Sequence, residues 1–142
     1  MNIFVGCSDK KDLLDQYNSS YKLIDELSKI DNVNLVFRDE LKDLIKDINI
    51  EPVSYINKES IIYDKSDVIL ILPGGLGIMA DLFSAITNNK KVILYNIDYF
   101  FTPIIQYLYK LYNCNFIDVV PSDYMLIEND YKKIVNMIRE MN

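Results

Sequence analysis

The sequence predicts an α/β fold, in which a single doubly wound, mainly parallel sheet is flanked by helices. Short β-branched apolar runs alternate with longer amphipathic runs, which is the pattern of βαβ units. Half of the 142 residues are hydrophobic and a quarter are charged, as in a globular protein. A chain of this length can bury one continuous core, and no linker or internal repeat divides it. We therefore expect one domain over residues 1–142.

The expected strands and helices alternate along the whole chain. The strands are placed at Asn2–Gly6, Asn34–Phe37, Pro52–Ile56, Asp67–Leu72, Lys91–Tyr95 and Phe116–Val119. The helices are placed at Lys11–Ile30, Glu40–Ile48, Lys58–Lys65, Gly77–Asn89, Thr102–Tyr112 and Tyr131–Met141. Because each helix follows a strand, the strands should run parallel to one another.

Two of the helices carry local signals of their own. The first has apolar residues at spacings of three and four, so this stripe should face the sheet. The stripe consists of Tyr21, Leu23, Ile24, Leu27 and Ile30. In the fifth helix, Thr102 can cap the N-terminus and Pro103 can take the first position, where a missing N–H costs nothing.

The composition excludes several classes of function. A net charge of −6 argues against binding to a nucleic-acid polymer, which depends on clustered Lys and Arg. A single phosphate is still possible, because backbone N–H groups can hold it. The chain has no histidine, which excludes His-dependent triads and His-ligated zinc or haem. Cys7 and Cys114 lack the spacing of a metal or redox motif, so we expect two free cysteines, no metal and no cofactor.

The apolar runs are too short to cross a membrane. Val68–Leu72 is far below the roughly 20 residues that a spanning helix needs. The N-terminal segment Met1–Gly6 has no basic region before it, so it is expected to be a strand and not a signal peptide. These features predict a cytoplasmic protein that has no membrane partner.

A glycine-rich turn, Pro73-Gly74-Gly75-Leu76-Gly77, lies between an apolar strand and an expected helix. Glycine permits a positive φ and lets the backbone approach a ligand closely. Successive N–H groups at a helix N-terminus attract an anion in the crevice beyond the carboxyl ends of the strands. A tight βα connection without a ligand would also explain the glycines.

Asp81 falls about one turn into the helix that follows the glycine-rich turn. From there it could point over the loop toward a ribose. An acid in a first helical turn also complements the helix dipole, so the residue alone does not decide between the two roles.

The residues around the turn resemble the signature of the Lonely Guy (LOG) family, once described as lysine decarboxylases. Ser66-Asp67, the strand and Pro-Gly-Gly-x-Gly are similar to the family's Pro-Gly-Gly-x-Gly-Thr-x-x-Glu segment. Lys91–Asn96, Asp98–Phe101 and Gly6-Cys7-Ser8 are also similar to family segments. The resemblance implies a Rossmann-like fold and hydrolysis of the N-glycosidic bond of nucleoside 5′-monophosphates, notably cytokinin ribotides, to a free base and ribose 5-phosphate.

The resemblance also implies roles for individual residues. Asp81 takes the position of the catalytic glutamate, and Lys58 falls where the family has an arginine that assists catalysis. The phosphate and nucleotide would be bound by Gly6, Ser8, Gly74, Gly75, Leu76, Gly77, Ile78 and Asn96. The family commonly forms dimers, so a homodimer or larger homo-oligomer is expected by analogy.

Four departures from the family pattern fall in the expected site. Ile78 replaces a threonine, which removes a hydrogen bond worth about 0.5–1.5 kcal/mol. Asp81 is one methylene shorter than glutamate, and such a displacement of about 1 Å can cost about 100-fold in rate. Lys58 cannot make the two-pronged contact of an arginine. A second glycine-rich loop of the family is replaced by Arg38–Leu41.

Three functions are consistent with these features. The first is a hydrolase in which the carboxylate of Asp81 stabilises an oxocarbenium-like ribose. In this hydrolase Lys58 orients the Asp81 carboxylate. The second is a non-catalytic binder, sensor or sequestering protein for a small phosphorylated nucleoside, which the departures favour. The aromatic turn Tyr99–Phe101 suits stacking on a base, or packing in a core or interface. A structural domain without any ligand is the third, and the retained glycines speak against it.

Overall fold

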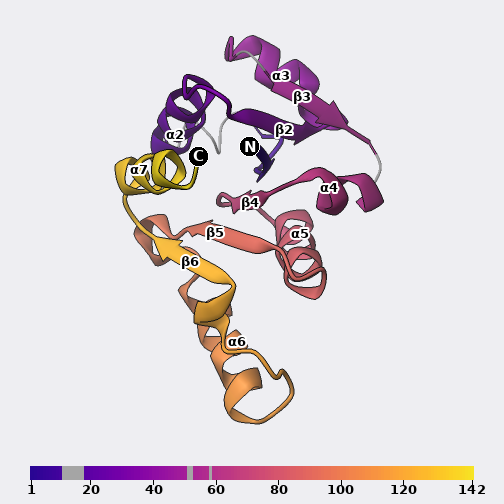
Figure 1. Cartoon of the computed structure of the whole chain (residues 1–142), viewed down its shortest axis with the longest axis vertical. Helices are drawn as coiled ribbons and strands as arrows, with labels where there is room; N and C mark the ends of the chain where they lie inside the picture. Colours follow the sequence, from indigo (N-terminus) through magenta and orange to yellow (C-terminus); the bar gives the residue numbers. More distant parts are fainter. Residues whose placement is uncertain (11–17, 51–52, 58) are drawn as a thin grey trace.

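A parallel sheet forms the centre of the molecule in the computed structural model, which describes residues 1–10, 18–50, 53–57 and 59–142 (Figure 1). The strands of the described residues are β1 (Asn2–Gly6), β2 (Asn34–Arg38), β3 (Val53–Ile56), β4 (Val68–Ile71), β5 (Lys91–Tyr95) and β6 (Met125–Glu128). The helices are α2 (Asn18–Ser28), α3 (Lys42–Asp47), α4 (Glu59–Lys65), α5 (Leu76–Thr87), α6 (Thr102–Asn113) and α7 (Tyr131–Met141). Short 3₁₀ turns cover Asp39–Leu41, Ile97–Tyr99 and Pro121–Asp123.

The strand order is β3-β2-β1-β4-β5-β6, and each neighbouring pair is parallel. The first three strands build the sheet outward from β1, and the chain then returns to place β4 on the other side of β1. This reversal makes the gap between the carboxyl ends of β1 and β4 a topological switch point, where ligands bind in open α/β sheets. Gly6 is in register with Ile71 there. The predicted doubly wound fold is confirmed.

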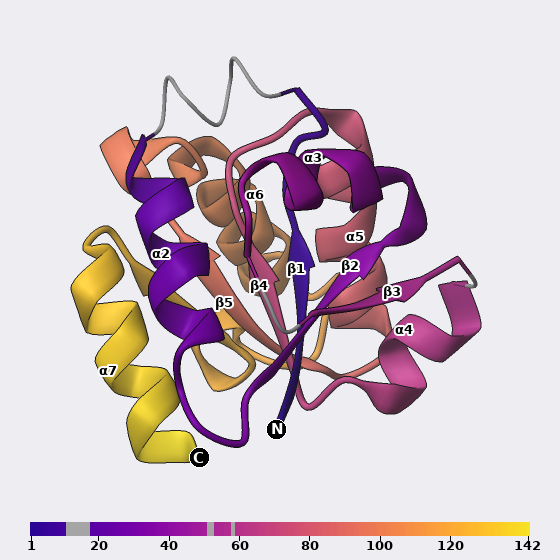
Figure 2. The same ribbon diagram turned by 90° about the horizontal axis from the view of Figure 1, so that it is seen from above.

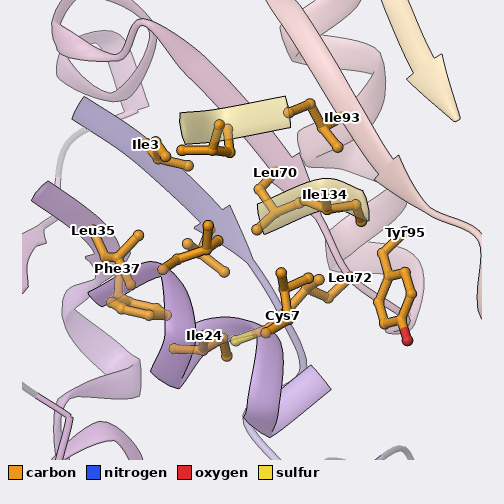
Figure 3. Close-up of a cluster of buried hydrophobic side chains, with 14 of the residues drawn as sticks. Ile3, Cys7, Ile24, Leu35, Phe37, Leu70, Leu72, Ile93, Tyr95 and Ile134 are labelled. Atoms are coloured by element: carbon orange, nitrogen blue, oxygen red, sulfur yellow. The ribbon is translucent and has the colours of Figure 1, made fainter. Parts of the chain in front are cut away.

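Helices cover both faces of the sheet, so the central strands β1, β4 and β5 are buried on both sides. Figure 2 shows α2 and α7 side by side on one face, with α4 and α5 on the other. Side chains alternate along a strand, so Ile3 and Val5 enter one core whereas Phe4 enters the other. Figure 3 shows the first core, in which Ile24 of α2 and Ile134 of α7 meet the sheet. The predicted apolar stripe of the first helix packs here.

The prediction of the sixth strand at Phe116–Val119 is wrong, because this strand lies at Met125–Glu128. The Phe116 N–H donates to the Leu111 carbonyl at 2.8 Å, which ties this segment to the end of α6. Figure 1 shows α6 extending away from the sheet, and Phe116 is 78% exposed. The segment therefore has apolar strand-forming residues but no neighbouring strand to pair with.

The predicted start of the fifth helix also needs correction. Phe101 is the N-cap of α6 and its side chain makes no capping bond. Thr102 is the first helical residue, so Pro103 is the second. The N–H of Phe101 donates to the side chain of Asn96 at 2.7 Å, which holds the segment that leads into α6.

Some predicted element ends lie outside the described residues. These are residues 11–17 of the first helix, Pro52 of the third strand and Lys58 of the third helix. The predicted helix at Glu40–Ile48 is a 3₁₀ turn followed by the shorter α3. None of the described helices has the length and hydropathy needed to cross a bilayer.

Candidate functional site

A cavity of about 500 Å³ opens at the carboxyl edge of the sheet, beside the switch point. Its walls come from residues 4–10 of β1 and the segment after it, from Arg38–Leu41 at the end of β2, and from the first turns of α5. The charged side chains on these walls are Asp9, Lys10, Arg38, Glu40 and Asp81. The site thus combines a helix N-terminus with charges from two strand ends.

The glycines of the turn differ in what they contact. A Cβ on Gly74 would lie 2.2 Å from Cγ1 of Ile78, so this position has no room for a side chain. A Cβ on Gly75 or Gly77 would meet nothing within 4 Å, and both residues line the cavity. None of the four glycines has a positive φ, so conformational freedom was the wrong reason for their presence. Close packing explains Gly74, and Gly75 and Gly77 leave the backbone uncovered.

The N-terminus of α5 presents backbone N–H groups beside the cavity. Gly75 is the N-cap, and its carbonyl accepts from the N–H groups of Ile78 and Met79 at 3.1 and 3.2 Å. The N–H groups of Gly75, Leu76 and Gly77 donate to no other described residue. The first N–H groups of a helix lack intrahelical partners and carry its positive end. They are suited to bind an anion.

Leu76 and Ile78 alternate with these glycines and lie in different environments. Leu76 is 89% exposed and is not among the residues that line the cavity, so only its backbone N–H remains for the predicted role. Ile78 lines the cavity although it is only 8% exposed, and its side chain also belongs to the core between α5 and the sheet, beside Gly74. Its apolar side chain therefore packs in the protein interior where the resembled family has a hydroxyl.

Asp81 is the buried charge of the cavity. It lies one turn beyond the α5 N-terminus, is 2% exposed, and forms an ion pair with Arg38, whose Nη2 donates to its Oδ1. The Arg38 side chain is 23% exposed, and its guanidinium lies 5.6 Å from the centre of the Phe4 ring. This distance permits a cation–π contact, which fixes the guanidinium from a second direction.

The pairing of Arg38 with Asp81 was not predicted from the sequence. Lys58 was expected there, and it lies outside the described residues. Arg38 comes from the end of β2, 43 residues earlier in the chain than Asp81. The available signal was the position of an arginine directly after an apolar strand, because the carboxyl ends of parallel strands meet at one edge.

The loop after β1 closes the other side of the cavity. Ser8 lines it, and its Oγ accepts a hydrogen bond from the Lys10 N–H at 3.1 Å, which shapes the loop. Gly6 also lines the cavity, and a Cβ at this position would lie 3.4 Å from Oδ2 of Asp81. The structure therefore brings Gly6, Ser8 and Asp81 together with the glycine turn.

Asn96 and the aromatic turn lie outside the cavity lining. The Asn96 side chain accepts from the Phe101 N–H and donates to Oγ1 of Thr102 at 3.1 Å, so it organises the entry into α6. Phe101 is buried in the core, whereas Tyr99 is 71% exposed. Their predicted contact with a base stays a prediction.

Cys7 lines the cavity but is not suited to be a nucleophile. It is buried, and desolvation raises the pKa of its thiol from 9.0 to about 12, with smaller contributions from the negative charges of Asp81 and Asp9. The thiolate is the reactive form of cysteine, so the folded protein holds Cys7 in its unreactive form at neutral pH. Cys114 is exposed.

We expect native protein at pH 8 to take up one equivalent of iodoacetamide, at Cys114. Cys7 should react at least about 1,000-fold more slowly than an ordinary thiol, because its raised pKa leaves almost no thiolate. Denaturation should expose it and bring the uptake to two equivalents, which mass spectrometry of peptides can assign. Rapid labelling of Cys7 in folded protein would contradict its burial.

Comparison with known proteins places the chain in a family. A search of curated proteins finds no match. The sequence model of the family described as "Possible lysine decarboxylase" matches residues 37–138, which include Arg38, the glycine turn and Asp81. This match covers more than half of the chain and agrees with the resemblance carried by the glycine turn. The chain belongs to this LOG-like "possible lysine decarboxylase" family.

Proposed function

We propose that the chain binds a nucleoside 5′-monophosphate in this cavity and hydrolyses its N-glycosidic bond. The observation that carries the proposal is the placement of a buried carboxylate, Asp81, one helical turn from three backbone N–H groups that have no described partner. A volume of about 500 Å³ is within the range of small-molecule sites. The family membership supports the same activity class.

The phosphate would bind at the N-terminus of α5. Gly75, Leu76 and Gly77 contribute the N–H groups, and the helix dipole favours the negative charge without a cationic side chain. The absence of side chains at Gly75 and Gly77 leaves the phosphate oxygens room to approach the backbone. This end of the ligand supplies binding energy that positions the rest.

The ribose would then lie over Asp81. Asp81 lies four positions after Gly77, about 6 Å along the helix axis, which is comparable with the reach of a 5′-phosphate across its pentose ring. The bond between the anomeric carbon and the base nitrogen breaks, and its electron pair leaves with the base. Asp81 stabilises the positive charge on the ribose, and water adds to the anomeric carbon and loses a proton. The base takes up a proton, and the products are free base and ribose 5-phosphate.

The experiment is incubation of the protein with AMP, GMP, CMP, UMP and cytokinin ribotides, followed by chromatography for the free base. We expect release from at least one nucleotide. Asp81→Asn should lower the rate by about 100-fold or more, because it removes the negative charge at nearly constant volume. Its nucleotide-induced rise in Tm should remain, because the phosphate contacts are on the backbone.

A non-catalytic nucleotide binder is the second candidate, and the Arg38–Asp81 ion pair favours it. A guanidinium beside the carboxylate compensates the negative charge that a cationic ribose would need. A rise in Tm with nucleotide, together with no base released from any member of the panel, would support this binder and contradict the hydrolase.

A further inference from the structure

We propose that Arg38 is the positioning residue of this site, which holds the Asp81 carboxylate in its working orientation. The inference rests on the proposed hydrolysis and assigns a role to a residue at the end of β2. The ion pair between Arg38 and Asp81 joins that strand end to α5 across the cavity.

The burial of Asp81 creates the need for such a residue. A carboxylate that is 2% exposed has lost nearly all contact with solvent, and a buried charge is stable only with a partner of good geometry. Arg38 supplies that partner through Oδ1. Oδ2 lies toward Gly6, where the absence of a side chain keeps the space beside the carboxylate open to the cavity.

Arg38 is itself held in place by its surroundings. Its guanidinium lies over the Phe4 ring, at 5.6 Å from the ring centre, and the arginine directly follows the central part of β2. Phe4 is fully buried in β1, so the ring cannot move without disturbing the sheet. Because the guanidinium is fixed relative to the sheet, the carboxylate that pairs with it is fixed as well. Small displacements of a catalytic carboxylate have large effects on the rate.

The chain contains one other arginine, Arg139, which is exposed on α7 and does not line the cavity. It offers a matched control, because Arg139→Ala removes the same charge from a site without the ion pair. Arg38→Lys keeps the charge but loses the planar geometry, so it separates charge from orientation.

Steady-state kinetics of base release test the proposal. We expect Arg38→Ala to lower kcat about 100-fold with less than about a threefold change in KM, and Arg38→Lys to recover only part of the loss. Guanidinium ion added to Arg38→Ala should restore activity more than methylammonium does. Arg139→Ala should match the unmodified protein. An unchanged kcat in folded Arg38→Ala, or a loss confined to KM, would overturn the positioning role.

A crystal structure of Arg38→Ala gives a readout that does not depend on activity. The Asp81 carboxylate is expected to leave its position beside Gly6 once the Arg38 guanidinium no longer donates to Oδ1. A carboxylate that stays in place would overturn the inference even if the protein hydrolyses nucleotides. If the unmodified protein releases no base while the carboxylate moves in the variant, the hydrolysis fails and the structural effect of Arg38 on Asp81 stands.

Discussion

Arg38→Met is expected to lower the free energy of unfolding by about 3 kcal/mol, because it removes the guanidinium that pairs with the buried carboxylate of Asp81. Methionine approximates the volume of the arginine stem, so the loss reports the charge and not a cavity. Urea denaturation followed by circular dichroism measures it. A loss below about 0.5 kcal/mol, typical of exposed ion pairs, would show that solvent reaches Asp81.

The double variant Arg38→Met, Asp81→Leu should regain most of this stability. Replacing both members of a buried ion pair by apolar residues of similar volume is often neutral or stabilising by about 1–4 kcal/mol. The double variant should also show no hydrolysis, since it lacks the carboxylate. A double variant that is less stable than either single variant would mean that the pair is not an isolated buried unit.

Gly74→Ala is expected to destabilise the protein by about 2 kcal/mol, because its new methyl would lie 2.2 Å from Cγ1 of Ile78. Ile78 is β-branched and buried, so it cannot easily turn away. Gly75→Ala and Gly77→Ala are the matched controls, since a Cβ at either position meets nothing within 4 Å. Their Tm should stay near that of the unmodified protein.

The partner of Gly74 can be tested with a double-mutant cycle. In an Ile78→Ala background the clashing Cγ1 is gone, although the Cβ of residue 78 remains 3.0 Å away. Adding Gly74→Ala there should therefore cost at least about 1 kcal/mol less than in the unmodified protein. Equal costs in both backgrounds would show that Ile78 is not what excludes a side chain at Gly74.

Local patterns in the sequence were enough to predict most of the fold. The apolar run Val68–Leu72 followed by glycines gives a strand and a turn from consecutive residues alone, and β4 and α5 lie there. The prediction of a strand at Phe116–Val119 failed although the apolar and β-branched content of this segment is that of a strand. Met125–Glu128 forms the strand because it has a neighbour, β5, with which it can pair. Which distant segments pair depends on the whole chain, so the composition of one segment does not reveal its partner.

The candidate site also has one part that the sequence predicts and one part that it does not. The glycine turn and Asp81 occupy one continuous segment, so sequence spacing brought them together as candidates. The sequence singles out Arg38 only as part of the segment that replaces a glycine-rich loop. Its contact with Asp81 depends on the order of β2, β1 and β4 in the sheet. A contact of this kind can be predicted only once the strand order is known.

The central place of β1 has a consequence for how the chain folds during synthesis. One edge of β1 can pair with β2 early, but the other edge waits for β4, which begins 62 residues after the end of β1 at Gly6. At about 5–20 residues per second the delay lasts several seconds, with an apolar strand edge open to other nascent chains. Asp81 leaves the ribosome shortly after β4. The second edge of β1 is therefore covered and the α5 wall of the cavity is added at nearly the same moment, so a chain that ends before β4 would have neither.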